Sequence, residues 1–368
     1  MTHRSPAASL RVRSVTCTPV EVPLRYVLGT SAATVRAAPL LLVELHTEEG
    51  VTGRSYVFAY RRSGAKSIAL VLQDAVEVIA GDGVVPAAIA EKLQRRLALL
   101  GVTGIARMAL SALDMALWDA LALAAGMPLA CLLGATVRAV PAYNSCGLGL
   151  MGPQAAADEA QELLEGGFRA VKLRLGHPTL AQDLAVTRAV RARLPDSVSL
   201  LVDYNQALTR AEALARGRAL ETEGVAWLEE PIRHDDLAGN VEIARTLAMP
   251  LQLGENFDGP KDLLRAVQAQ ACDLAMPDVA RIGGVSGWMQ AAGVAAAHGM
   301  PVSSHLMPEV SAHLLAATPT AHWLEYVDWT DAIAAEPVQV TDGQWPIPDR
   351  PGTGLAWDAG AVEKYRIQ

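Results

Sequence analysis

Three short sequences decide the fold of this chain: LVD at 201–203, WLE at 227–229 and LGE at 253–255. Each lies at the end of a run of apolar residues that is typical of a buried strand, and the last residue of each is an acid. The three acids are equally spaced, since 229 − 203 = 26 and 255 − 229 = 26. One strand, one helix and two short loops together are about that long. The sequence therefore predicts three successive parallel strands, each with a carboxylate at the same end.

These acids, Asp203, Glu229 and Glu255, are predicted to form a metal site. In a barrel of βα units, the carboxyl ends of the strands form the active-site face. Three carboxylates that converge there repel one another unless a hard cation neutralises them, and Mg²⁺ prefers ligands that are all oxygen atoms. A single acid at a strand end is more often the cap of the next helix, but three acids in equal phase favour a magnesium site.

Length and charge limit the classes of function. The chain has 368 residues, which suits a barrel with one smaller domain, and 51% of them are hydrophobic, enough for a large core. The formal net charge is −8 and the sequence pI is about 5.5. Nucleic acids and anionic membranes are bound by basic surfaces, so neither is expected as a partner.

The location is inferred from cysteines and apolar segments. The four cysteines lie far apart without CxxC spacing, so neither a disulfide framework nor a zinc site is expected, and a reducing cytoplasm is the predicted location. Residues 1–12 contain arginines but no apolar segment, and no signal peptide is expected. The most apolar long segment, 106–125, contains Arg107, Asp114 and Asp119, so no membrane span is expected.

Residues 1–135 are predicted to form a separate α+β domain. Residues 40–45 and 51–58 are expected to pair as a hairpin. The stretch before them, 26–39, is small, polar and rich in glycine and alanine, which indicates a mobile loop. Helices follow, and the clearest covers 107–124, where leucines recur at helical spacing.

Strands and helices alternate from residue 136 to residue 330. Eight strand-like runs are separated by alanine-rich helical stretches, which predicts a parallel sheet closed into a barrel. The runs are 140–143, 170–175, 198–203, 225–229, 251–255, 274–276, 301–304 and 323–326. Residues 331–368 are rich in proline and glycine and are predicted to pack back on the first domain.

One glycine motif does not indicate a cofactor. Gly147, Gly149 and Gly152 match the pattern GxGxxG. A dinucleotide fingerprint also needs an acid about 20 residues later, at the end of a second strand. The corresponding strand carries Lys172 and Arg174 instead. We therefore interpret the glycines as a flexible loop after the first barrel strand.

Lys172 and Arg174 are predicted to point into the barrel. They lie in an otherwise apolar strand, and strand alternation places both on the same face. The two cations could form a structural ion pair with buried acids. Their position beside three carboxylates favours a role in the active site.

Two later strands also end in polar residues. Asp278 follows Glu255 by 23 residues, and His305 follows Asp278 by 27, so each again lies one βα unit further on. A carboxylate that orients an imidazole gives a general base near neutral pH. Glu325 ends the eighth strand and is interpreted either as an acid on the rim of the site or as a helix cap.

Together these residues suggest removal of a proton next to a carboxylate. The metal would polarise the substrate carboxylate and stabilise the enediolate that forms. Lys172 would add positive charge to the same oxygens, and His305, held by Asp278, would take the proton. Arg174 would approach the opposite face of the substrate.

The chain resembles the enolase superfamily, and within it the mandelate racemase group. The motifs that carry the resemblance are VDYNQ at 202–206, WLEEP at 227–231, GEN at 254–256, LAMPD at 274–278, IGGV at 282–285, SSHL at 303–306 and SAHLLAATPTAHWLE at 311–325. The resemblance implies a (β/α)₇β barrel of the TIM type under an N-terminal α+β capping domain. It also implies a small carboxylate substrate and a homo-oligomer, often an octamer.

The resemblance assigns a role to each candidate residue. Mg²⁺ binds the three acids named above, Lys172 contacts the substrate carboxylate, and Glu325 hydrogen-bonds to that carboxylate. The pair His305–Asp278 acts on the (R) enantiomer. Further residues implied to contact the substrate are Ser145, Asn205 and an apolar set of Leu28, Ala32, Val35, Phe58, Tyr60, Leu99 and Leu306.

Arg174 departs from the pattern of the family. The family motif is Lys-x-Lys, and its second lysine is the base on the (S) face. A neighbouring cation can tune a lysine toward neutral pH, whereas an arginine keeps its proton. The main prediction is racemisation of a mandelate-like 2-hydroxy acid, favoured by the dyad and the apolar pocket. The alternative is an acid-sugar dehydratase that eliminates water with His305 as its one base. A binding protein without turnover is disfavoured, because the metal ligands and the dyad are all present.

Overall fold

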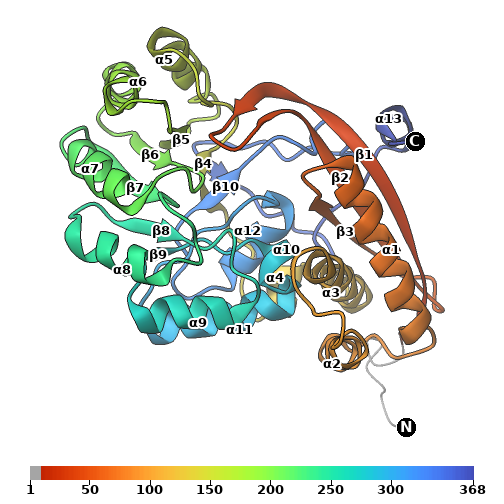
Figure 1. Cartoon of the computed structure of the whole chain (residues 1–368). Helices are drawn as coiled ribbons and strands as arrows, with labels where there is room; N and C mark the ends of the chain where they lie inside the picture. The colour runs from red at the N-terminus through yellow and green to blue at the C-terminus, as the bar shows by residue number, and fades with distance from the viewer. Residues whose placement is uncertain (1–9) are drawn as a thin grey trace.

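The structure is a computed structural model that describes residues 10–368 (Figure 1). The expectation about a signal peptide in residues 1–12 therefore falls mostly outside the described range. The described chain forms an antiparallel sheet with helices, drawn in red and orange in Figure 1, beside a curled parallel sheet ringed by helices. The predicted fold class, a barrel with an α+β cap, is confirmed.

The cap begins with three antiparallel strands in the order β1-β2-β3. They are β1 (Val12–Gly29), β2 (Thr34–Thr47) and β3 (Thr52–Phe58), followed by the helices α1 (Arg62–Ile79), α2 (Pro86–Arg96) and α3 (Gly104–Ala125). The predicted hairpin is the pairing of β2 with β3, in which Leu40 lies opposite Phe58. One face of this sheet is covered by apolar side chains of α1 and α3.

The predicted mobile loop at 26–39 is wrong. Strands β1 and β2 continue through it as a two-stranded ribbon, with Leu28 opposite Val35 and Gly29 opposite Thr34. Only residues 30–33 form the turn. Small residues favour a loop, but the backbone hydrogen bonds between two strands do not depend on side-chain size. The tip of this ribbon contacts the barrel, because the Ser31 hydroxyl donates to the Tyr204 carbonyl at 3.0 Å.

Helix α3 is the core of the cap. Gly53 of β3 packs so closely against it that a Cβ atom there would lie 2.1 Å from the carbonyl oxygen of Ala116. Glycine is therefore required for this approach of sheet and helix. The helix is long and apolar enough to cross a membrane, but 67% of its most apolar window is buried inside the protein, as in a core helix.

The second part is the parallel barrel. Its strands follow the order β10-β4-β5-β6-β7-β8-β9. They are β4 (Val140–Asn144), β5 (Ala170–Arg174), β6 (Ser199–Asp203), β7 (Val225–Glu229), β8 (Leu251–Leu253), β9 (Leu274–Ala275) and β10 (Leu324–Tyr326). The predicted run 301–304 forms no extended strand. It closes the barrel through single bridges, which pair Val302 with both Ala275 and Ala321.

Helices connect the strands on the outside of the barrel (Figure 1). The short α4 (Leu129–Leu132) precedes β4, and the connecting helices are α5 (Pro153–Glu162), α6 (Leu180–Arg193), α7 (Arg210–Leu220), α8 (Leu237–Thr246), α9 (Pro260–Ala269), α10 (Val279–Ile282), α11 (Gly284–Ala297) and α12 (Pro308–Ala316). Two of them begin with a capping box, at Thr179 and Thr209, which fixes where the chain turns from strand to helix.

The C-terminal segment joins both parts. Its strand β11 (Gln344–Trp345) pairs antiparallel with β4 of the barrel, and its helix α13 (Ala359–Tyr365) lies beside the cap sheet. The Ile367 amide donates to the Pro19 carbonyl at 2.9 Å. The segment thus contacts both the cap and the barrel. We keep domain boundaries near 135 and 330 as a proposal.

The buried His313 links three segments. Its Nδ1 accepts a hydrogen bond from the Ala130 amide at 3.1 Å, and its Nε2 donates to the Thr353 carbonyl at 3.1 Å. This pattern requires the neutral imidazole. Burial lowers the pKa of His313 to about 4, against which the hydrogen bond to Thr353 acts weakly.

His313 is expected to make the fold acid-sensitive. Between pH 6.5 and 4 the unfolded chain binds the proton that folded His313 refuses, so stability falls as the pH falls through this window. The loss is about 3 kcal/mol between pH 7 and pH 4. Urea unfolding across this range measures it. His313→Gln should flatten the pH dependence, while the exposed control His298→Gln should not. Equal pH slopes for all three proteins would contradict the assignment.

Candidate active site

Three carboxylates meet at the mouth of the barrel. Asp203 and Glu229 end neighbouring strands β6 and β7 and lie directly opposite each other in the sheet, and Glu255 follows β8. One oxygen from each lies within 4.8 Å of the others. The structure therefore brings the three predicted metal ligands together, because equal spacing in the sequence becomes equal height in the barrel.

The electrostatics of this cluster suit a divalent cation. Burial raises the pKa of Glu229 to about 8; Lys172 opposes the shift, and the charges of Asp203 and Glu255 add to it. The pKa of Asp203 is also raised, by burial first. Burial and mutual repulsion both oppose ionisation of these carboxylates. A hard cation between them would therefore stabilise their charged form strongly. The donor set thus fits Mg²⁺.

Polar neighbours hold two of these ligands in place. The Asn205 amide donates to Asp203 Oδ1 at 2.7 Å and its side-chain Nδ2 to Asp203 Oδ2 at 2.8 Å. Behind Glu229, Trp227 Nε1 and Gln252 Nε2 both donate to Oε2 at 3.2 Å. Such partners fix the orientation of ligands before a metal binds.

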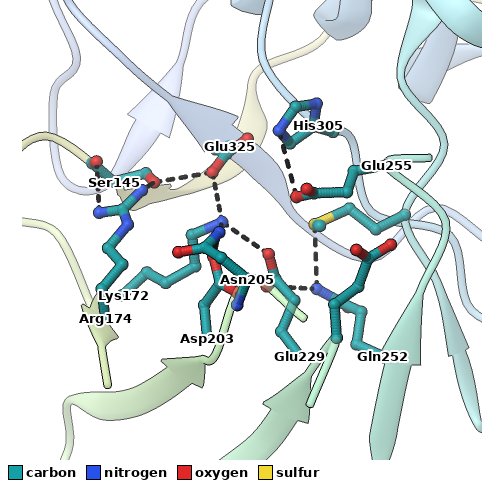
Figure 2. A network of polar contacts seen from close by, with 12 residues as sticks. Ser145, Lys172, Arg174, Asp203, Asn205, Glu229, Gln252, Glu255, His305 and Glu325 are labelled. Carbon is teal, nitrogen blue, oxygen red and sulfur yellow. Dashed lines mark hydrogen bonds and ion pairs between the residues drawn. The ribbon is translucent and has the colours of Figure 1, made fainter. Parts of the chain in front are cut away.

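Lys172 lies at the centre of the polar network (Figure 2). Its Nζ is 2.7 Å from Glu229 Oε1, 2.7 Å from Glu325 Oε1 and 3.8 Å from Asp203 Oδ2. Burial lowers the pKa of Lys172, but these carboxylates outweigh burial and raise it above the ordinary value. Lys172 is therefore a fixed positive charge and not a base.

Arg174 is held by the loop after β4. Its Nη1 donates to the carbonyls of Ser145 and Gly147 at 2.9 and 2.7 Å, and its Nη2 donates to Ser145 Oγ at 2.7 Å. The side chain is 4% exposed. Three N–H bonds to one loop give the guanidinium a structural role in addition to any contact with substrate. The glycines that match GxGxxG form this loop, and Gly149 packs against Gly29 of the cap, where a Cβ would lie 2.4 Å from the Gly29 nitrogen.

His305 and Asp278 form the predicted dyad. His305 Nδ1 lies 2.7 Å from Asp278 Oδ2, and Asp278 Oδ1 accepts from the Ala280 amide at 2.6 Å as the N-cap of α10. The helix start thus orients the carboxylate, and the carboxylate orients the imidazole. His305 Nε2 remains directed at the site, 3.3 Å from Glu255 Oε2.

The charge around His305 sets its proton affinity. Burial lowers the pKa of His305, but the carboxylates of Glu255, Asp278 and Glu325 together raise it to about 9. The charge of Glu255 is the largest single cause that raises this pKa, followed by the hydrogen bond to Asp278. A cation held by Glu255 would offset part of this negative charge and so lower the pKa of His305 toward the neutral range, in which histidine acts as a base.

Glu325 accepts hydrogen bonds from three sides. Its Oε1 lies 2.7 Å from both Lys172 Nζ and Ser145 Oγ, and its Oε2 accepts from the Leu306 amide at 2.7 Å. Burial raises its pKa, but Lys172 and His305 outweigh burial and hold the pKa below its ordinary range. The contact of Glu325 with the substrate carboxylate stays a prediction.

A cavity of about 1010 Å³ lies between this site and the cap. Residues of the predicted apolar set that line it are Leu28, Ala32, Val35, Phe58, Tyr60 and Leu306. The prediction for Leu99 is wrong: it is fully exposed in the turn between α2 and α3, and it is absent from the cavity wall. Ser145 is buried behind Arg174 and Glu325 and bridges them instead of lining the cavity.

Two family models match the chain. Residues 12–134 match the mandelate racemase/muconate lactonizing enzyme N-terminal domain, and residues 155–361 match the enolase C-terminal domain-like model. The chain belongs to the mandelate racemase/muconate lactonizing enzyme family. The resemblance predicted from the sequence motifs is confirmed, and the protein is an enzyme of the enolase superfamily.

Several members of this family, with different chemistry, are similar to this chain. L-talarate/galactarate dehydratase of Salmonella typhimurium is 33% identical over 320 residues, which cover 86% of this chain and 80% of the dehydratase. An enolase from alpha proteobacterium BAL199, solved with magnesium, is 45% identical with a TM-score of 0.95 and covers 98% of this chain and 100% of its own. An enolase from Bradyrhizobium, solved with magnesium and mandelic acid, is 39% identical with a TM-score of 0.93 and covers 98% and 99%.

Sequence reasoning missed several residues of this family member. Trp227 and Gln252 support Glu229, and strand alternation could have found Trp227, two residues before Glu229 on the same face. Arg36 and Arg61 also line the cavity, but nothing in their local sequence indicates it. Arg36 on β2 and Arg61 just after β3 reach the cavity because the cap packs over the barrel, whereas Arg281 lies on the barrel side, in α10.

Proposed function

We propose that this protein is a magnesium-dependent dehydratase of sugar acids, which removes the proton next to a carboxylate and eliminates a β-hydroxyl group as water. The observation that carries the proposal is the asymmetry of the two faces of the site. One side presents the His305–Asp278 pair, with Nε2 directed at the cavity. The other presents Arg174, whose N–H groups are bound to loop carbonyls and which keeps its proton.

The residues of the chain divide the work. Lys172, a fixed ammonium group, contributes positive charge where the substrate carboxylate gains electron density. His305 Nε2 accepts the α-proton while Asp278 holds the imidazole through Nδ1 and stabilises its charged form. The same imidazolium then donates this proton to the departing β-hydroxyl, which leaves as water. The resulting enol becomes a 2-keto-3-deoxy acid.

Asp203, Glu229 and Glu255 are the residues proposed to hold Mg²⁺. When bound, the ion supplies positive charge that stabilises the negative charge developing on the substrate carboxylate. Magnesium in the solved relatives from BAL199 and Bradyrhizobium supports this choice of cation. The cytoplasmic location and the octameric assembly remain predictions.

Relatives support the dehydratase proposal more than racemisation. The Salmonella relative is a dehydratase, and further relatives are named as arabinonate and D-gluconate dehydratases. A single base suffices for elimination, whereas racemisation needs a proton donor on the opposite face, where this chain has Arg174. The alternative made from the sequence thus becomes the main proposal.

Racemisation of a mandelate-like acid is the second candidate. An aromatic wall favours it: the Phe58 ring lies 4.4 Å from that of Tyr60 and 4.7 Å from that of Trp329, centroid to centroid. All three residues line the cavity. The Bradyrhizobium relative binds mandelic acid.

Product analysis distinguishes the two candidates. The protein with Mg²⁺ is incubated with a library of sugar acids and, separately, with each mandelate enantiomer. We expect 2-keto acid from at least one sugar acid and no conversion of one mandelate enantiomer into the other. Interconverted mandelate without 2-keto acid from any sugar acid would replace the proposal with the second candidate.

A further inference from the structure

The cavity wall carries more positive charge than its acids balance. Six lysine and arginine side chains line it, against four acids, in a chain whose net charge is −8. The cations are Lys172, Arg174, Arg36, Arg61, Arg62 and Arg281. Such an excess opposes the overall composition, so it marks a surface that faces an anion.

Each acid of the cavity wall already has a partner. Asp203 and Glu255 belong to the proposed metal site, and Glu325 lies 2.7 Å from Lys172. Glu21 is paired with Arg62. Within the described residues, no carboxylate lies in ion-pair contact with Arg36, Arg61 or Arg281.

Arg281 is positioned by neutral groups. Its Nη1 donates to Asn256 Oδ1 at 2.7 Å, and its guanidinium carbon lies 4.9 Å from the centroid of the Tyr60 ring. Its Nε is buried without a hydrogen-bond partner in the described chain. Stacking on an aromatic ring orients a guanidinium and leaves its edge free to donate hydrogen bonds.

The backbone beside Arg61 is held in an unusual conformation. Tyr60 has a φ of 61°, a left-handed conformation that costs free energy for a residue other than glycine. The bend turns the Tyr60 ring over Arg281 and places Arg61 in the cavity wall. Arg36 lies in the same wall on β2, the strand that pairs with β3.

We infer that Arg36, Arg61 and Arg281 bind a second anionic group of the substrate, so that the preferred substrates are dicarboxylate sugar acids. The inference rests on the proposed dehydratase function. One carboxylate of the substrate lies at Lys172 and the metal ligands, and the carboxylate at the other end of the carbon chain lies at the three arginines. Guanidinium groups suit this task because they donate paired hydrogen bonds to a carboxylate.

Matched substrate pairs test the inference. Galactarate and galactonate have the same carbon chain, and only galactarate carries the second carboxylate; glucarate and gluconate form a second pair. We expect kcat/KM to favour the dicarboxylate by at least roughly tenfold in one pair, since a hydrogen bond to a charged group is worth a factor of about ten to a hundred. In Arg61→Gln and Arg36→Gln, kcat/KM for the dicarboxylate should fall about tenfold, mainly through KM, and that for the monocarboxylate should stay within about twofold. Arg13→Gln, an exposed cap arginine outside the cavity wall, is the control and should change neither value.

Binding separates a failure of the inference from a failure of the proposed function. Calorimetry with the His305→Asn protein and Mg²⁺ measures the affinity for both acids of each pair without turnover. If the dicarboxylate binds more tightly and this preference is lost when Arg61→Gln is added, the result supports binding of the second carboxylate by Arg36, Arg61 and Arg281, the arginine wall. This holds even if neither acid is dehydrated. Absence of dehydration would overturn only the proposed function. If both acids are dehydrated at equal kcat/KM and bind with equal affinity, the assignment of the three arginines to a second carboxylate is wrong and the proposed function stands.

Discussion

Replacing His305 with asparagine is expected to lower kcat roughly a thousandfold, because a positioned general base contributes a factor of about 10² to 10⁴. His305 is the one imidazole that lines the cavity within the described chain, and its Nε2 has no protein hydrogen-bond donor in front of it. Asparagine retains the size and polarity of the site but cannot accept a proton at neutral pH. Steady-state measurement of 2-keto acid formation gives the value.

The control for this variant is His298→Asn. His298 is exposed at the end of α11 and bonds only to the Val294 carbonyl of its own helix. Its replacement should leave kcat unchanged, and calorimetry should find magnesium affinity preserved in both variants. A His305→Asn protein that keeps a kcat within tenfold of the parent would remove the dyad from the mechanism.

Replacing Asp203 with asparagine is expected to lower magnesium affinity at least a hundredfold. The change removes one of three charged ligands and places an amide NH₂ group against the donors of Asn205, which now bind both Asp203 oxygens. Mutating a residue that only hydrogen-bonds to a metal ligand lowers metal affinity by a factor of about 10 to 100, so loss of a ligand itself should cost more. Turnover at millimolar magnesium should fall in parallel.

Thermal unfolding provides a readout of this variant that is independent of activity. A metal at a hundred times its dissociation constant stabilises the native state by about 2.7 kcal/mol. Magnesium should therefore raise the unfolding midpoint of the parent and of Asp196→Asn, which alters an exposed acid before β6, but not that of Asp203→Asn. Equal magnesium-induced shifts in all three proteins would place the metal elsewhere.

Periodic features of the sequence predicted the barrel side of the site well. The spacing is the same between Asp203, Glu229 and Glu255. Because successive βα units are equally long, equal spacing places the three carboxylates at the same end of neighbouring parallel strands, close together. The same logic placed His305 beside Asp278, one unit further on. These predictions depend on local strand ends and on a regular repeat, both of which are visible in the chain.

The cap side of the site was less predictable. The small, polar and glycine- and alanine-rich sequence at 26–39 predicts a mobile loop, yet these residues pair as a two-stranded ribbon. The family resemblance implies that Leu99 lines the pocket, yet Leu99 is exposed in the turn between α2 and α3. Arg36 and Arg61 reach the cavity through the packing of one domain on another, which no local pattern encodes. Long-range packing thus separates the missed residues from those that were found.

The central claim is that one base, His305, acts on one face of the substrate. The direct test is to incubate the enzyme and Mg²⁺ with a sugar acid that it dehydrates, in D₂O, and to examine the unreacted substrate by NMR. The account predicts 2-keto-3-deoxy acid, with the recovered substrate retaining its configuration at C2 whether or not deuterium has entered there. Recovery of the C2 epimer would show proton delivery from the side of Arg174 and would contradict the account.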